Sequence, residues 1–454
     1  MLDLVKRRGH ALGLLAAGLL LVACGSSPVD RLARPPNLYA TGQNYQADRV
    51  PAALRSVSPR VLYVTDRSQR LNGDGTVSYL AERSDSMAFG AAEVQFQGVA
   101  DWSELVRMTH ADTGARPPRL NVTSYKDEIR FSKTPLPPER RFGRVVTEAG
   151  AERDYALFAQ QFRRAMGEEV RRAGTGRVLL FVHGVNNGFD DALTSLTNIW
   201  HYSGRRSIPM TFSWPAGSAG VFKYFKDREA GDFSVFHLKE LLDLLASVPE
   251  IEDIDIVAHS RGTDVATAAL RELVIRERGR GKRPKVTLKT GTLILAAPDL
   301  DVGIVRQRLI SERFFSAFEQ VNVYVNPDDR ALALSSWLTQ EARFGQLDAS
   351  HFAPGELAAL KKVGLVHFIR VEGAGGLGHA YFRDNPGAMS DIALALRTRA
   401  FPGGTLRPLK LDHDNFWTLK PNYPLDQLPD LDPGRAFDPV RDLAFVPAFD
   451  GGER

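Results

Sequence analysis

A serine near the middle of the chain stands where a strand-like segment gives way to a helix-like one. The run Ile254–Ala258 is apolar and β-rich, Ser260 follows it, and an Ala-rich amphipathic run begins at Asp264. Ala258 and Gly262, two residues to either side of Ser260, are both small, as a sharp strand-to-helix turn requires. Such a turn lifts the hydroxyl clear of the sheet edge, so the pattern predicts a nucleophile. The alternative is a structural serine that caps the following helix.

A nucleophilic serine that attacks a carbonyl needs backbone N–H donors for the oxyanion that forms. The first donor is expected from Arg261, the next residue in the chain. The second is expected from the loop that follows the strand-like run Val178–Val182. There Gly184 permits close backbone approach, and Val185 and Asn186 turn away from the strand.

The serine also needs a base, and in this fold class the chain order is Ser, acid, His. Of the ten histidines, four follow a plausible acid: His351, His367, His379 and His413. His367 lies inside an apolar strand-like run, His351 lies in a loop between helices, and His413 lies in the tail. His379 follows the last predicted strand in a Gly-rich loop (EGAGGLGHAYF), so we expect it to be the base.

Acidic residues follow two strand-like runs at the edge of the sheet where active sites of open α/β folds form. Asp328 and Asp329 follow Val321–Asn326, and Asp299 and Asp301 follow the preceding strand. We favour Asp329, because a strand-end acid just before a helix commonly orients the base. Asp299, Asp301 and Asp328 remain alternatives; the first two would otherwise cap a helix or brace the site.

Short apolar strands alternate with amphipathic helices from about residue 150 onward. This alternation predicts an α/β fold with a mostly parallel central sheet flanked by helices, a β-rich segment before it and an extended tail after it. The strand-like runs in the alternating part are Val178–Val182, Pro209–Ser213, Ile254–Ala258, Thr292–Ala297, Val321–Asn326 and Gly364–Val371. We expect a single domain over residues 57–400, preceded by a flexible tether (24–56) and followed by a Pro- and Asp-rich extension (401–454).

The N-terminus has the features of an export signal. Lys6, Arg7 and Arg8 precede an apolar run, Ala11–Ala23, that is too short to span a bilayer comfortably. The run ends in Leu-Val-Ala-Cys, which resembles a bacterial lipobox, and Cys24 is the only cysteine of the chain. We therefore expect a signal peptide over residues 1–23, acylation at Cys24, and a lipid-anchored protein of the bacterial cell envelope at the outer membrane, facing the periplasm.

The composition excludes several classes of function. A formal net charge of +4 on 454 residues gives no global attraction to nucleic acid. The sequence contains neither a metal-binding His and Cys spacing nor a phosphate-binding loop nor a dinucleotide fingerprint. We expect no metal, no cofactor and no nucleic-acid partner. The oligomeric state is not encoded in any motif.

Six segments occur in an order that resembles one α/β-hydrolase family of unknown function, found in many bacterial proteins. They are FVHGVNNGFDDA, SWPAG, IVAHSRG, LAAPDLD, NPDDRALALS and GHAYF, and the resemblance covers roughly residues 57–385. It implies an α/β-hydrolase fold with Ser260, Asp329 and His379 in the triad positions. Arg261 replaces a common Met and Ala258 a common Gly; the family itself implies no substrate.

The sequence thus predicts a serine hydrolase of ester, thioester or amide bonds, with a carboxylesterase or lipase as the first choice because an anchored enzyme would meet acyl lipids. Two alternatives stay open, a non-catalytic envelope scaffold and an acyltransferase that uses the same triad. Phe314, Phe315 and Phe318 form either an acyl pocket or ordinary helix core.

Overall fold

The computed structural model describes most of the chain between residues 30 and 425. The described residues are 30–40, 45–110, 114, 116–218, 222–352, 354–375 and 377–425. The expected signal peptide, the expected acylation site Cys24 and residues 426–454 of the expected extension lie outside them. Within the described ranges, no helix combines the length and apolar character needed to cross a membrane.

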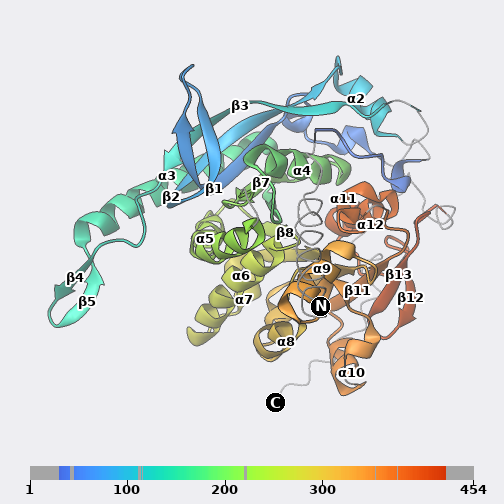
Figure 1. The fold of residues 1–454 in the computed structure, drawn as a ribbon. Coiled ribbons are helices and arrows are strands. Elements are labelled where there is room, and N and C mark those ends of the chain that lie inside the picture. The colour runs from blue at the N-terminus through green and yellow to red at the C-terminus, as the bar shows by residue number, and fades with distance from the viewer. Residues whose placement is uncertain are drawn as a thin grey trace, which may run out of the picture.

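An eleven-stranded sheet forms the centre of the molecule, in the order β12-β13-β11-β10-β9-β8-β6-β7-β1-β2-β3 (Figure 1). Its strands are β1 (Arg60–Leu71), β2 (Val77–Gln97), β3 (Arg119–Arg130), β6 (Arg177–Val182), β7 (Ile208–Ser213), β8 (Asp253–His259), β9 (Thr290–Ala296), β10 (Gln320–Val325), β11 (Val366–Val371), β12 (Lys410–His413) and β13 (Phe416–Leu419). Neighbouring strands from β13 to β1 run parallel, whereas β12, β2 and β3 are antiparallel to their neighbours. The predicted fold class is confirmed.

Helices cover both faces of this sheet (Figure 1). One face carries α4 (Phe189–Tyr202), α11 (Tyr381–Asp384) and α12 (Pro386–Thr398), and the other carries α3 (Ala149–Ala173), α5 (Lys223–Ala246), α6 (Gly262–Gly279) and α7 (Pro284–Leu288). The remaining helices are α2 (Trp102–Thr109), α8 (Val302–Ile304), α9 (Arg330–Thr339) and α10 (Pro354–Val363). Because both faces are covered, the central strands are buried along nearly their whole length, which explains their continuous apolar sequences.

The register of the central strands brings their carboxyl ends to one edge. Val182 pairs with Ala258, Ala258 with Leu295, and Leu295 with Val323. The loops that follow β6, β8, β9 and β10 therefore begin side by side, and the predicted site residues lie on these loops and on the loop after β11.

The segment predicted as a flexible tether is ordered against the body where the structure describes it. Three short 3₁₀ turns lie at Asn37–Tyr39, Ala47–Arg49 and Ala52–Leu54, and Leu38, Tyr39 and Tyr45 are buried. The N–H of Leu38 donates to Ser390 Oγ on α12 (3.0 Å), and Tyr45 Oη lies 3.1 Å from His201 Nδ1 on α4. The tether prediction is wrong for residues 30–40 and 45–56, because single apolar residues dock individually and leave no periodic pattern.

The first part of the predicted C-terminal extension belongs to the sheet. Strands β12 and β13 form a hairpin, and β13 pairs in parallel with β11. The rings of Phe368 and Phe416 stack across that pair with centroids 4.7 Å apart. The buried Arg407 forms an ion pair with Asp391 on α12 (2.7 Å). A boundary at residue 400 is therefore wrong, because the domain continues through β13.

The N-terminal β-rich segment forms a long antiparallel ribbon. Strand β2 starts at Val77 and pairs with β1 from its first residue, whereas the sequence predicts only a β-rich segment without bounds. The first half of β2 mixes apolar with polar and charged residues and is mostly half-buried, so it lacks the continuous apolar run by which a buried strand is recognised.

A second, two-stranded sheet stands apart from the first. Strands β4 (Pro138–Arg141) and β5 (Arg144–Thr147) form a hairpin between β3 and α3, and it projects beyond the rest of the molecule (Figure 1).

Candidate active site

Ser260 occupies a strained turn between β8 and α6. Its φ angle is +52°, in the left-handed region that residues with a side chain rarely adopt. The N–H of Ser260 donates to the carbonyl oxygen of Ala296 on the neighbouring strand (2.9 Å). Backbone strain of this kind persists only where the surroundings fix it, and it is concentrated at functional sites.

The residues around this turn have no room for larger side chains. A Cβ atom added to Gly262 would lie 2.2 Å from the carbonyl oxygen of His183, and one added to Gly184 would lie 2.8 Å from Ser260 Cβ. Ala258 is completely buried. The small residues found in the sequence are therefore required by the close approach of the loop after β6 to the turn after β8.

The structure brings the three predicted triad side chains into one hydrogen-bonded chain. Nε2 of His379 lies 2.9 Å from Ser260 Oγ, and Nδ1 of the same ring lies 2.7 Å from Asp329 Oδ2. The carboxylate accepts the Nδ1 proton, which leaves Nε2 as the acceptor for the serine hydroxyl. This is the geometry in which a histidine takes a proton from a serine.

Asp329 is held in place by the helix that it begins. It is the N-cap residue of α9, and its Oδ1 accepts the N–H groups of Ala331 (2.9 Å) and Leu332 (3.0 Å). The side-chain amide of Gln346 donates to the carbonyl oxygen of Asp329 (2.9 Å). Because Oδ1 is engaged by the helix, Oδ2 remains directed at the imidazole.

The loop that carries His379 is fastened to the end of β10. The Asn326 side-chain amide donates to the carbonyl oxygen of Gly378 (2.8 Å), and the N–H of Arg330 donates to that of Leu377 (3.0 Å). Gly378 has a φ of +70°, and a Cβ atom there would lie 2.6 Å from the Asn326 amide nitrogen. The Gly-rich sequence thus allows the loop to pass close to β10 and deliver the imidazole.

The electrostatic surroundings of His379 favour its protonated form. Burial lowers the pKa of His379, but the charge of Asp329, its hydrogen bond and the more distant charge of Asp299 outweigh burial. The net pKa therefore lies above the ordinary value of 6.5. Asp329 thus stabilises a protonated imidazole at this position.

His259 lies directly behind the candidate base. Its ring centroid is 5.0 Å from that of His379 and 4.3 Å from that of Phe382. Burial, followed by the charge of His379, holds the pKa of His259 well below 6.5. A neutral ring in this position packs against the base without adding a charge to the site.

Of the four residues predicted for the oxyanion hole, Gly184, Val185, Asn186 and Arg261, only Asn186 has its N–H engaged by another described residue. The N–H groups of Val185 and Arg261 make no hydrogen bond to any other described residue. The chain turns at Asn186 (φ +58°), whose N–H donates to Asp227 Oδ2 (2.9 Å). The prediction is therefore wrong for Asn186. Gly184 contributes space beside the serine.

Asp227, on α5, joins two loops of the site through a buried carboxylate. Besides the Asn186 N–H, it accepts the N–H of Gly217 on Oδ2 (3.1 Å) and that of Ser218 on Oδ1 (3.0 Å). Only 1 % of the residue is exposed. It fixes the loop after β6 against the loop after β7, and the sequence analysis missed it.

Arg67, on β1, supports the same two loops from the other side. Its guanidinium donates to the carbonyl oxygens of Asn187 and Ala216, both at 2.8 Å, and its Nε donates to Ser213 Oγ (2.9 Å). Burial lowers the pKa of Arg67 to about 10, so it remains charged at neutral pH. This support was also missed.

The alternative acids do not contact His379. Asp301 caps α8 by accepting the N–H of Ile304 (2.7 Å), and Asp328 is exposed. The buried Asp299 instead accepts the hydroxyls of Tyr224 (3.0 Å) and Ser335 (2.8 Å).

A small cavity of about 30 Å³ opens beside the serine hydroxyl. The polar part of its wall includes the Tyr224–Ser335–Asp299 cluster, and the rest is apolar. Its lining residues are Val185, Tyr224, Ser260, Asp299, Ala331, Leu332, Leu334, Ser335, Leu338 and His379.

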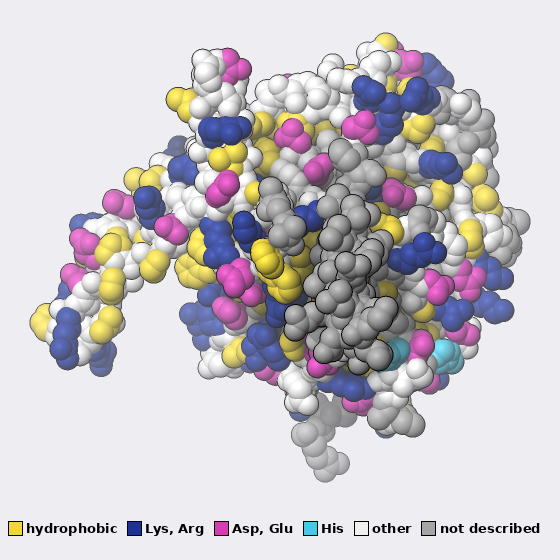
Figure 2. Space-filling model, in the orientation of Figure 1, with side chains coloured by type: hydrophobic (Ala, Val, Ile, Leu, Met, Phe, Trp, Pro, Cys, Tyr) yellow, Lys and Arg dark blue, Asp and Glu magenta, His cyan; other side chains and the backbone are white. Residues whose placement is uncertain are grey.

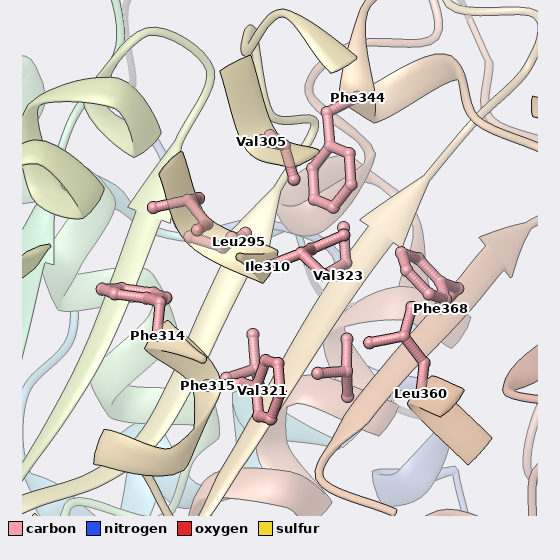
Figure 3. Close-up of a pocket in the computed structure, with 12 residues that line it drawn as sticks. Leu295, Val305, Ile310, Phe314, Phe315, Val321, Val323, Phe344, Leu360 and Phe368 are labelled. Atoms are coloured by element: carbon pink, nitrogen blue, oxygen red, sulfur yellow. The ribbon is translucent and has the colours of Figure 1, made fainter. Parts of the chain in front are cut away.

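A second cavity, of about 40 Å³, lies on the sheet between β9, β10 and β11 and is lined by apolar residues alone (Figure 3). Phe314 and Phe315 line it, whereas Phe318 packs on Phe314 with ring centroids 5.1 Å apart. None of the triad side chains reaches this cavity. The Phe cluster thus combines an apolar cavity with core packing.

The comparisons with known proteins agree with this fold. The chain belongs to the family described as alpha/beta hydrolase of unknown function (DUF900), whose model matches residues 159–397, more than half of the chain. The matched range contains Ser260, Asp329 and His379, and Arg67 lies outside it. A search of curated proteins found no match.

Proposed function

We propose that the protein is a serine hydrolase in which Ser260 is the nucleophile, His379 the base and Asp329 the acid that orients it. The observation that carries this proposal is the position of His379, which bridges the other two side chains at 2.9 and 2.7 Å. The strained turn at Ser260 supports the assignment, because a serine that only capped a helix would not need a left-handed backbone.

The reaction follows from this geometry. Ser260 Oγ attacks the acyl carbon, its proton passes to His379 Nε2, and the carbonyl oxygen takes up the displaced electron pair. The N–H groups of Val185 and Arg261 stabilise that oxyanion. The leaving group departs with the proton from His379, which leaves an acyl-serine. Water then attacks the acyl carbon, with the same histidine first accepting and then returning a proton.

We propose carboxylic esters as the preferred substrates, as in a carboxylesterase or lipase. Three leucines, Leu332, Leu334 and Leu338, line the cavity next to the serine, and burial of an apolar acyl group against them is favourable. Thioesters and amides pass through the same intermediate. We further propose that acylation at Cys24 holds the enzyme on the bacterial envelope, where acyl lipids are at hand.

Labelling with a fluorophosphonate probe tests this function directly. The wild-type chain and a Ser336→Ala control on α9 should label, and Ser260→Ala should neither label nor hydrolyse a p-nitrophenyl ester. Thermal unfolding should be nearly the same for all three proteins. A Ser260→Ala protein that still labels at one site would exclude Ser260 as the nucleophile, and a wild-type chain that never labels would favour a scaffold.

A further inference from the structure

The β4–β5 hairpin is an arm whose end has no support from the body. It forms its own two-stranded sheet and projects from the molecule between β3 and α3 (Figure 1). An isolated two-stranded hairpin is only marginally stable in water. The chain nevertheless maintains one here, at the end of the long helix α3.

The end of this arm combines apolar and cationic side chains. Phe142 is 98 % exposed and Val145 is 78 % exposed, which is unusual for large apolar residues on one short turn. Arg140, Arg141 and Arg144 flank them along the chain, and residues 138–147 contain three arginines and one acid, Glu139, which forms an ion pair with Arg141. Figure 2 shows Lys and Arg side chains beside hydrophobic ones at the end of the arm.

The turn at the end of the arm contains Phe142, a residue type that its left-handed backbone conformation disfavours. Arg141 pairs with Arg144, so Phe142 and Gly143 form a two-residue turn with φ angles of +49° and +77°. Two positive φ angles are typical of a type I′ turn, in which Asn-Gly is the favoured pair. A bulky aromatic residue is strained there. Among the described residues, none covers more than a trace of the Phe142 side chain, so contact outside the molecule explains its presence better than folding does.

We propose that the tip of this arm, Arg140–Val145, inserts into an anionic lipid surface. An aromatic side chain enters the headgroup region favourably, and arginines beside it bind lipid phosphates. A convex two-residue turn suits such a surface better than a protein partner, because a stable protein interface covers about 800 Å² on each side. The proposal does not depend on the reaction at Ser260.

A fluorescent reporter on the arm tests insertion in the full-length chain. Because Cys24 is the only cysteine, Cys24→Ser with Val145→Cys leaves one thiol for an environment-sensitive fluorophore. The matched control places the thiol at Leu71, which is 72 % exposed at the end of β1. Both proteins keep the apolar N-terminal segment, so attachment through that segment affects them equally. Each is mixed with phosphatidylcholine vesicles, with or without phosphatidylglycerol.

We expect the reporter at position 145 to shift to shorter wavelength, and to be quenched by brominated acyl chains, only on the anionic vesicles. Phe142→Asn should abolish this quenching. Replacing the three arginines by Gln should weaken the response about 10²-fold. A reporter that stays in water on anionic vesicles would overturn the proposal, as would an equal response at position 71. A shift without vesicles that disappears on dilution would show instead that the tip binds a second copy.

Discussion

Two residues of this protein share one unusual backbone conformation in opposite surroundings. Ser260 has a φ of +52° and is 4 % exposed, whereas Phe142 has a φ of +49° and is 98 % exposed. The turn at Ser260 is fixed by hydrogen bonds and by close contact with the loop after β6. The turn at Phe142 is held by a two-residue hairpin alone. The same chain therefore contains a strained turn that packing stabilises, at Ser260, and a strained turn that no packing against the described body stabilises, at Phe142.

The difference indicates where each residue acts. At the carboxyl edge of the sheet, the surrounding loops fix the turn at Ser260. This strained turn holds the Ser260 hydroxyl within hydrogen-bonding distance of the His379 imidazole. At the end of the arm, the structure does not require Phe142, so its side chain acts on something outside the molecule. Mutations at the two places should accordingly change different measurements.

The largest effect is expected at the acid. Asp329→Asn should keep the fold but lower kcat about 10⁴-fold, because the amide stabilises the wrong imidazole tautomer. The control is Asp301→Asn, which removes a charge but leaves an oxygen that can still cap α8, and it should retain most activity. Ester hydrolysis kinetics measure both. Near-normal turnover in Asp329→Asn would show that the hydrogen bond to Oδ2 has no catalytic role.

The next largest effect is expected at Asp227, which supports the loop after β6. Asp227→Ala leaves three N–H groups without their acceptor, and each unsatisfied buried donor costs roughly 1–3 kcal/mol. Partial rehydration of the loops reduces that sum, so we expect a loss of about 3–5 kcal/mol in the free energy of unfolding. Denaturant titration measures it. A loss under about 1 kcal/mol would mean that the loops are held by Arg67 alone.

A smaller effect is expected in the pH dependence of kcat/KM. His379 acts as a base only when neutral, and its pKa is raised above 6.5, so kcat/KM should fall as the pH drops through that raised pKa. The charge of Asp329 contributes to the elevation. The acid limb of the residual activity in Asp329→Asn should therefore move to lower pH. A profile that does not move would assign the limb to another group.

The smallest effect is expected at the arm. Phe142→Asn replaces a strained aromatic residue by the residue that a type I′ turn prefers, and it should stabilise the hairpin by about 1 kcal/mol. Amide hydrogen exchange of β4 and β5 measures this local stability, and hydrolysis at Ser260 should not change. Faster exchange in the variant would show that Phe142 contributes to folding.

The sequence was most informative where the structure is most regular. The strands β6 to β11 and the helices between them were found because buried parallel strands have continuous apolar sequences. Ser260, Asp329 and His379 were found because each follows such a strand at the same edge. Such patterns can be recognised in the sequence because each involves only residues that are neighbours along the chain.

The supports of the site could not be found in this way. Arg67 is one cation in a strand, and Asp227 lies among the other charged residues of α5, so both look like exposed surface residues in the sequence. Their partners lie far away along the chain. Asn186 was assigned to the wrong role for the same reason, because nothing local indicates that its N–H has an acceptor on α5.

The two ends of the large sheet lie outside the part of the chain that matches the family model. Residues 159–397 contain strands β6 to β11. Outside this range, β1 pairs with β7 and is followed in the sheet by β2 and β3, and β13 of the β12–β13 hairpin pairs with β11. A fragment cut to the matched range would expose an unpaired, apolar strand at each end. Bare strands of that kind pair with other chains. The flanking segments therefore cover the two strand edges at which a fragment of the matched range would pair with other chains.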